Sequence, residues 1–314
     1  MTGVLVIDKP QGLTSHDVVA AARRALGEKR VGHTGTLDPL ATGVLPLVIG
    51  HATRLVRFFA AADKDYDAIV RFGLSTDTYD ITGREITRTD RAPSQHDVSR
   101  ALQTLTGEYL QTPPPYSAKK VHGRRAYRLA RTDHAVALTP ASVNVMRADL
   151  IDFNGATTRV AITCSAGFYV RSFAHTLGEL VGTGGCLEAL RRTRSGEFDL
   201  QAAVQIDALG DTARVASRII PPSELLSHLP AVTITDRGRE DVSHGRELDS
   251  SDYEPAGLSA SLFPLPPSPS PLPPSPFTVP PESWVRLLDA RGCLVGMATS
   301  GSRPGSLHPS LVLM

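Results

Sequence analysis

Hydrophobic positions in the first part of the chain change from strand-like to helix-like spacing. A short apolar run at residues 3–7 predicts a strand, and Asp8-Lys9-Pro10 ends it. The next apolar positions follow one face of a helix, which we expect Ser15 to cap and Gly27 to end. These positions are Val18, Ala22 and Leu26.

The pattern continues with strands and helices of moderate length. Residues 31–43 are too rich in Gly, Thr and Pro for a regular element, whereas an apolar run at 44–49 predicts a buried strand. Residues 66–72 have a period of two and predict a strand with one buried face. That face carries Tyr66, Ala68, Val70 and Phe72. The other elements expected are a helix between Ser94 and Gly107, an extended loop at 111–117, strands at 142–153 and 158–165 joined by an Asn154-Gly155 turn, a helix at 170–181, and an arginine-rich segment at 187–198.

This order of elements predicts two domains. Residues 1–222 are expected to form an α+β domain around a central mixed sheet. Residues 223–314 should form a small β-rich domain, because strand-like segments occur at 231–235, 284–288 and 294–299. Residues 254–281 are dense in proline, which predicts a solvated, polyproline-like or disordered insertion in that domain.

Composition excludes two classes of protein. No run of about 18 apolar residues occurs, so we expect no membrane-spanning helix. The 3 cysteines are too few and too far apart for a disulfide scaffold or a metal site, which indicates a reducing, cytoplasmic compartment. We expect no signal peptide, because the first strand begins at once.

Charge adds a candidate binding surface. The 33 basic and 32 acidic residues give a net charge of +1, which does not decide for or against a nucleic-acid partner. One segment is basic without any acid, however, and a local patch of this kind can bind phosphate. It contains Lys119, Lys120, Arg124, Arg125, Arg128 and Arg131. Charge alone leaves a solvated helix face as an equal alternative.

The most informative stretch is Gly32-His33-Thr34-Gly35-Thr36-Leu37-Asp38-Pro39-Leu40-Ala41-Thr42-Gly43. Its glycines allow tight turns and close approach of a ligand, and Pro39 stiffens the chain directly after a carboxylate. A lone Asp-Pro in a loop is more often a turn than a catalytic group. From the residues alone we therefore infer a positioned acid, without a metal cluster, a phosphate loop or a Ser-His-Asp order.

This stretch resembles the catalytic motif of the bacterial tRNA pseudouridine synthase B (TruB) family, and further matches follow in family order. They are the Lys-Pro motif at 8–15, the tyrosine motif Lys64-Asp65-Tyr66, the RNA-binding insertion at 116–127, the arginine motif Gly167-Phe168-Tyr169-Val170-Arg171 and the late strand Leu190-Arg191-Arg192-Thr193. Residues 284–299 resemble part of a PUA-type RNA-binding domain. The resemblance implies a pseudouridine synthase fold with a largely antiparallel sheet, an insertion at about 112–133 and a PUA-like C-terminal domain.

The resemblance also implies a reaction: an isomerase, formally an intramolecular transferase, that converts uridine 55 in the T-arm loop of tRNA to pseudouridine. The uridine must be flipped out of its loop, at an unstacking cost of about a few kcal/mol. No cofactor and no metal are expected. The expected partner is the T arm of tRNA. We expect the protein to act as a monomer and not to bind a membrane.

Residue roles follow from the same motifs. Asp38 would be the nucleophile, Tyr66 would stack on the uracil, and Arg171 would pair with Asp38. The residues assigned to substrate binding include Lys9, together with Tyr169 and Leu190, which would line the uracil pocket. His33 would contact the tRNA loop and help keep the target nucleotide out of the stack. The phosphates of the T arm would be held by Lys120, Arg124, Arg125 and Arg128. Whether Asp38 attacks C6, attacks C1′ or assists elimination through a glycal stays open.

Ordinary alternatives exist for most of these residues. Tyr66, Tyr169 and Leu190 fit a hydrophobic core, and Arg171 and His33 fit an exposed surface. The chain also departs from the family pattern, because Lys119 replaces a usual hydrophobic residue and Thr176 stands where many members have Asp. Two rival functions are a non-catalytic RNA-binding module and a guide-dependent synthase of ribosomal RNA. Asp38, Tyr66 and Arg171 together favour an enzyme, because binding alone needs no buried acid.

Overall fold

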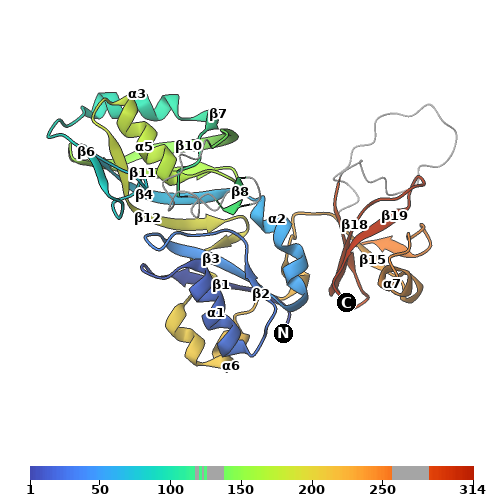
Figure 1. Cartoon of the computed structure of the whole chain (residues 1–314). Helices are drawn as coiled ribbons and strands as arrows, with labels where there is room; N and C mark the ends of the chain where they lie inside the picture. Colours follow the sequence, from blue (N-terminus) through green and yellow to red (C-terminus); the bar gives the residue numbers. More distant parts are fainter. Residues whose placement is uncertain (117–119, 122–123, 126–137, 257–282) are drawn as a thin grey trace, which may run out of the picture.

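The computed structural model describes residues 1–116, 120–121, 124–125, 138–256 and 283–314. Two separate β-sheets organise these residues, a large one in the first two thirds of the chain and a small one near the C terminus (Figure 1). Lys119, Arg128 and Arg131 of the basic segment lie outside the described residues, as does nearly all of the proline-rich stretch predicted to be disordered.

The large sheet has ten strands in the order β14-β1-β3-β12-β4-β11-β10-β7, with β2 paired to β3 and β13 paired to β12. Only the β1–β14 and β3–β12 pairs are parallel, so the predicted mixed and largely antiparallel sheet is confirmed. Its strands are β1 (Gly3–Lys9), β2 (Val31–His33), β3 (Thr42–Ile49), β4 (Lys64–Phe72), β7 (Gly107–Gln111), β10 (Ala141–Phe153), β11 (Thr157–Cys164), β12 (Gly185–Ser195), β13 (Phe198–Asp199) and β14 (Val204–Gln205).

Helices cover one face of this sheet in two groups (Figure 1). Helix α1 (Ser15–Leu26) and the short α6 (Thr212–Ala216) lie beside the β1 end, and α3 (Gln95–Thr104) and α5 (Val170–Leu180) lie over β10, β4 and β12. Their apolar faces share one core with the strands, including the predicted face of β4, where Ala68, Val70 and Phe72 are buried. Burial of this face follows from the period-two pattern.

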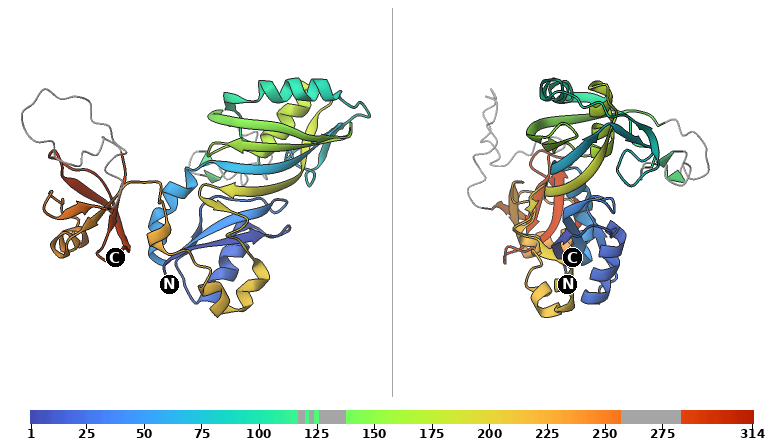
Figure 2. Two further views of the ribbon diagram at one scale, coloured as in Figure 1. Left: turned by 180° about the vertical axis from the view of Figure 1, so that it is seen from behind. Right: turned by 90° about the vertical axis from the view of Figure 1, so that its left-hand side faces the viewer.

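The small sheet has the strand order β16-β15-β17-β18-β19. Its elements are β15 (Ala231–Ile234), α7 (Asp236–Ser243), β16 (Tyr253–Pro255), β17 (Val285–Leu288), β18 (Leu294–Ser300) and β19 (Leu307–Val312). It stands beside α2 (Val56–Ala60) (Figure 2). There the Trp284 and Phe58 rings meet edge to face with centroids 5.0 Å apart. Arg57 also lies over the Trp284 ring, 4.2 Å from its centroid.

The remaining described elements are short. They are the hairpins β5 (Leu74–Thr76) with β6 (Glu85–Arg88) and β8 (Lys120–Val121) with β9 (Arg124–Arg125), and 3₁₀ turns at 50–55, 206–210 and 222–224. None of the helices in the described ranges is long and apolar enough to cross a membrane.

The structure corrects three details of the sequence prediction. The N-cap of α1 is Thr14 rather than Ser15, because the Thr14 hydroxyl accepts from the Asp17 amide and the Asp17 carboxylate accepts from the Thr14 amide. Ser15 is instead the first helical residue, and its side chain turns inward. Residues 31–33 form β2 although the region was expected to be irregular, and β19 was not predicted.

Candidate active site

The two halves of the large sheet meet where β3 runs parallel to β12, with Thr42 beside Arg191 and Gly43 beside Arg192. A Cβ on Gly43 would lie 2.1 Å from the Arg192 carbonyl oxygen, so only glycine permits this approach. The loop that carries Asp38 ends at this junction. The parallel contact therefore brings the loop beside β12.

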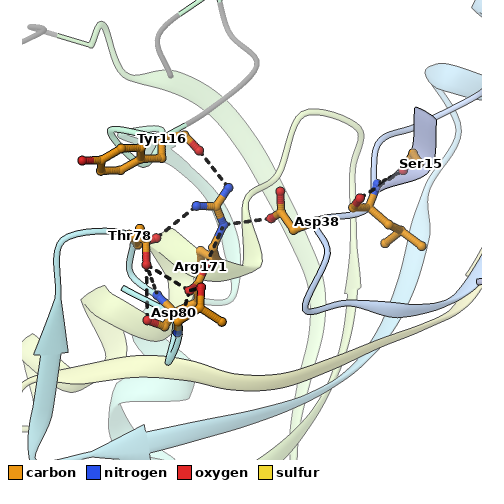
Figure 3. A network of polar contacts seen from close by, with 8 residues as sticks. Ser15, Asp38, Thr78, Asp80, Tyr116 and Arg171 are labelled. Carbon is orange, nitrogen blue, oxygen red and sulfur yellow. Dashed lines mark hydrogen bonds and ion pairs between the residues drawn. The ribbon is translucent and has the colours of Figure 1, made fainter. Parts of the chain in front are cut away.

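Hydrogen bonds from the first helix hold the loop around Asp38. The Ser15 hydroxyl donates to the Leu37 carbonyl at 3.0 Å and accepts from the Leu37 amide at 2.8 Å (Figure 3). The Gly12 amide donates to the Pro39 carbonyl at 2.8 Å. These contacts fix the backbone on both sides of Asp38, while its side chain remains 41% exposed.

Arg171 faces Asp38 from the first turn of α5. Its Nε lies 2.9 Å from Asp38 Oδ2, and its side chain is only 8% exposed. The guanidinium also donates through Nη1 to the Thr78 carbonyl and through Nη2 to the Tyr116 carbonyl, both at 3.0 Å (Figure 3). Arg171 is therefore not a surface residue, and its partner is the carboxylate that the resemblance implied.

A second carboxylate supports Arg171 from below. Asp80 is 8% exposed, and its Oδ2 lies 3.8 Å from Arg171 Nε. Its Oδ1 accepts from the Thr82 amide at 3.0 Å, the Thr82 hydroxyl at 2.6 Å and the Thr78 hydroxyl at 2.9 Å. Thr176 supplies no acid on α5, but Arg171 still has several partners among the described residues. They are the carboxylates of Asp38 and Asp80 and the carbonyls of Thr78 and Tyr116.

A cavity of about 320 Å³ lies between these groups. Asp38 and Arg171 line it together with Tyr66, Tyr169 and Leu190, three of the residues assigned to the uridine. Tyr66 is half-buried at the pocket, and burial raises the pKa of its phenol, opposed by the Arg192 charge. Gln111 anchors Tyr169 by donating to its carbonyl at 3.1 Å and accepting from its amide at 2.8 Å.

Two predicted binding residues do not line this cavity. Lys9 is fully buried, and its ammonium donates to the carbonyls of Pro10 at 2.9 Å and Leu13 at 2.7 Å. Burial lowers its pKa to about 8, and the Asp38 charge opposes that shift. Lys9 thus braces the turn before α1, and its expected contact with substrate stays a prediction. His33 lies in β2, where burial lowers the pKa of its imidazole.

Two cations that line the cavity were missed as site residues. Arg192 is 1% exposed and donates to the carbonyls of Val44 at 2.7 Å and Gly35 at 3.1 Å. Lys64 donates to the carbonyls of Ala60 and Ala62, and burial lowers its pKa to about 8. Both belong to motifs in the sequence, but residue type alone places Lys and Arg on the surface.

The basic segment is described only in part. Lys120 pairs with Arg125, and Val121 with Arg124, in the backbone of the β8–β9 hairpin.

Among the described residues, no group of three or more His, Cys, Asp or Glu side chains is arranged to hold a metal ion. The cavity offers one exposed carboxylate, the buried guanidiniums of Arg171 and Arg192, the ammonium of Lys64 and an aromatic wall.

Comparisons with known proteins relate this site to a family. A model of the TruB family pseudouridylate synthase N-terminal domain matches residues 23–170, and one of the tRNA pseudouridylate synthase B C-terminal domain matches 171–229. The tRNA pseudouridine synthase B of Solibacter usitatus is 44% identical over 257 residues, covering 81% of this chain and 88% of the relative. That of Gloeobacter violaceus is 45% identical over 240 residues, covering 74% and 81%.

Solved structures share the fold. The archaeal box H/ACA sRNP Nop10-Cbf5 complex matches with a TM-score of 0.71 and 23% identity, over 100% of this chain and 86% of the other. An H/ACA RNP bound to a substrate RNA containing 2′-deoxyuridine matches with a TM-score of 0.70 and 23% identity, over 100% and 85%. The fold expected from the sequence is thereby confirmed.

Proposed function

The chain belongs to the TruB family of pseudouridylate synthases, and we propose that it isomerises uridine 55 in the T-arm loop of tRNA, with Asp38 as the nucleophile. The observation that supports this most is the Asp38–Arg171 pair at 2.9 Å on the wall of a cavity. The buried guanidinium orients the carboxylate at the point where a base can enter. A protein that only binds RNA has no need of this arrangement.

The reaction rearranges one nucleotide without adding atoms. The C1′–N1 bond breaks, the uracil turns, C5 bonds to C1′, and the proton leaves C5 while N1 gains one. An ionised carboxylate can divide this into easier steps by covalent attack or by stabilising an electron-poor sugar. Asp38 is suited to either role, because Arg171 holds Oδ2 and no hydrogen bond among the described residues engages Oδ1.

The other cavity residues would bind the uracil. Tyr66 offers an aromatic face and a hydroxyl, and Tyr169 and Leu190 close the apolar walls. The buried Arg192 places a positive charge beside Tyr66, where negative charge on a departing uracil would be stabilised.

The rest of the molecule would hold the tRNA. We assign residues 1–222 to the catalytic domain and residues 223–314 to a PUA-like RNA-binding domain. The β8–β9 hairpin would contribute Lys120, Arg124 and Arg125 to phosphates of the T arm. Changing these three residues together to Ala should reduce the slope of log affinity against log salt by about 0.7 to 0.9 for each phosphate that is no longer neutralised. An unchanged slope would make the hairpin a solvated face.

One assay tests the proposed function. Purified protein is incubated with unmodified tRNA transcript, and pseudouridine is scored at each position, with Asp38→Asn as the control for a contaminating enzyme. We expect modification at position 55 only, without a guide RNA. Binding without modification would support an RNA-binding module, and modification of ribosomal RNA only with a guide would support a guide-dependent synthase.

A further inference from the structure

The loop that holds Arg171 contains an unusual residue, Tyr79. Its φ is +64°, and Tyr79 and Leu226 are the non-glycine residues with positive φ in the described part of the chain. A bulky side chain in this left-handed region is strained, and surrounding contacts must offset the strain. Such strain indicates that the loop is held in place by something specific.

Tyr79 stands between two residues that touch Arg171. Thr78 offers its carbonyl to Arg171 Nη1 at 3.0 Å, and the Asp80 carboxylate lies 3.8 Å from Nε. A rotation of the backbone at Tyr79 would therefore move the Thr78 carbonyl and the Asp80 carboxylate together, relative to the guanidinium. Backbone contacts tie the loop to β12, where the Leu187 amide donates to the Tyr79 carbonyl at 2.9 Å and the Ile81 amide donates to the Leu187 carbonyl at 2.8 Å.

The side chain of Tyr79 makes a different link, to the helix that carries Arg171. Its ring lies flat on the imidazole of His175, with centroids 3.9 Å apart and an angle of 4° between the planes. His175 follows Arg171 by four positions in α5, so both side chains lie on the same side of the helix. Burial lowers the pKa of His175, opposed by Glu179, so a neutral imidazole takes part in this stack at neutral pH.

We propose that the stack of Tyr79 on His175 is a positioning device for the reaction, because it clamps the 78–80 loop to α5 and thereby aims Arg171 at Asp38. Neither ring lines the catalytic cavity, so neither is a catalytic residue. Backbone bonds fix the loop to the sheet, and the stack fixes it to the helix. Without the stack, the carbonyl of Thr78 and the carboxylate of Asp80 can move relative to the guanidinium.

Kinetics test the proposal. These kinetic experiments rest on the proposed function, because they measure the conversion of tRNA. His175→Ala removes the stacked ring, and His175→Phe keeps an aromatic ring at the same place as the matched control. We expect His175→Ala to slow single-turnover conversion of saturated tRNA by about three- to tenfold, the usual worth of an aromatic pair, with tRNA affinity nearly unchanged. His175→Phe should restore most of the rate.

A double-mutant cycle separates positioning from general loosening. In an Arg171→Met background the guanidinium is gone, so His175→Ala should slow the reaction no further. If the two losses multiply independently, the stack does not act through Arg171 and the proposal is wrong. It is equally wrong if His175→Phe is as slow as His175→Ala.

A measurement without tRNA keeps the proposal separate from the proposed function. The Nε–H signal of Arg171 in a ¹H–¹⁵N spectrum, assigned by its loss in Arg171→Lys, should shift or broaden in His175→Ala and not in His175→Phe. An unchanged signal in His175→Ala would overturn the clamp, whatever the enzyme modifies. If that variant fails to fold, Tyr79→Gly removes the same stack and relieves the positive φ, and the same shift is expected.

Discussion

The cavity and the outer face of strands β4 and β12 use arginine differently. On the outer face, Arg194 grips Asp65 with Nε and Nη2, at 2.7 and 2.9 Å. At the cavity, Arg171 touches Asp38 with Nε alone and gives its other nitrogens to backbone carbonyls. The guanidinium therefore does not hold Asp38 at two points.

This difference has a chemical consequence. A carboxylate held at both oxygens is a weaker nucleophile, because a hydrogen bond to each oxygen draws charge away from it. Because protein carbonyls orient the guanidinium at the cavity, Asp38 can be held through one oxygen while the other faces the cavity. Exposed pairs such as Arg194–Asp65 add little to stability, whereas Arg171 is buried beside the buried Asp80, and breaking such a pair is costly. The comparison therefore predicts large effects on activity at the cavity and small effects on stability outside.

The largest effect should come from Asp38→Asn. The amide keeps the size of the side chain but removes the anion, so turnover should fall by more than about 10⁴-fold, the scale seen when a nucleophile is removed. Binding of tRNA should be largely kept, because the phosphate contacts lie elsewhere. Pseudouridine formation and filter-binding affinity measure the two effects. Near-normal turnover would remove the nucleophile assignment.

Arg171 should show a graded loss. Arg171→Met leaves Asp80 buried without its cation and Asp38 without its partner, and breaking a buried pair costs about 3 to 5 kcal/mol. Turnover should then fall by about 10²- to 10⁴-fold. Arg171→Lys keeps the charge but cannot reach Asp38, Thr78 and Tyr116 from one fixed plane, so it should retain part of the activity.

Single-turnover rates on saturated tRNA measure this gradient. Equal rates for the Lys and Met variants would show that the charge is irrelevant to Asp38. Loss of tRNA binding in both would make Arg171 an RNA contact instead, and the comparison of the two faces would then lose its chemical meaning.

Sequence reasoning reached the outer framework more easily than the support of the site. The period of two found the buried face of β4, and the Asn154-Gly155 turn found the β10–β11 hairpin, because both depend on local chemistry. Asp38 and Arg171 were found through motifs, and nothing local joins them. Their contact depends on the parallel β3–β12 junction, which is a long-range pairing.

The supporting charges could not be predicted, for a different physical reason. Asp80 follows a residue with positive φ, and a tyrosine gives no signal for that conformation. Lys64 and Arg192 are buried against carbonyls, whereas their residue types are usually exposed. Every residue has a backbone carbonyl, so the sequence gives no signal for a cation that is buried against carbonyls.

The burial of Lys64 at the cavity can be tested by the pH dependence of the unfolding free energy. Burial lowers its pKa from 10.5 to about 8, so between these values the unfolded chain holds a proton that the folded chain has released. The unfolding free energy of the wild type should therefore rise with pH across this window, relative to Lys64→Met. Urea unfolding of both proteins below pH 8 and near pH 10 measures the difference. Parallel pH curves would mean that Lys64 is solvated.

The smallest effect is expected on the outer face, at Arg194 and Asp65. Their side chains are 37% and 30% exposed, so water already stabilises both charges and salt screens their attraction. A double-mutant cycle with Arg194→Ala and Asp65→Ala should give a coupling of about 0.2 to 1 kcal/mol in urea unfolding, and turnover should stay near the wild-type value. The pair nevertheless lies on strands that also carry Tyr66 and Arg192, which reach the cavity. A large loss of turnover in these variants, without loss of stability, would show that the outer pair sets the register of the strands and that the two faces are not independent.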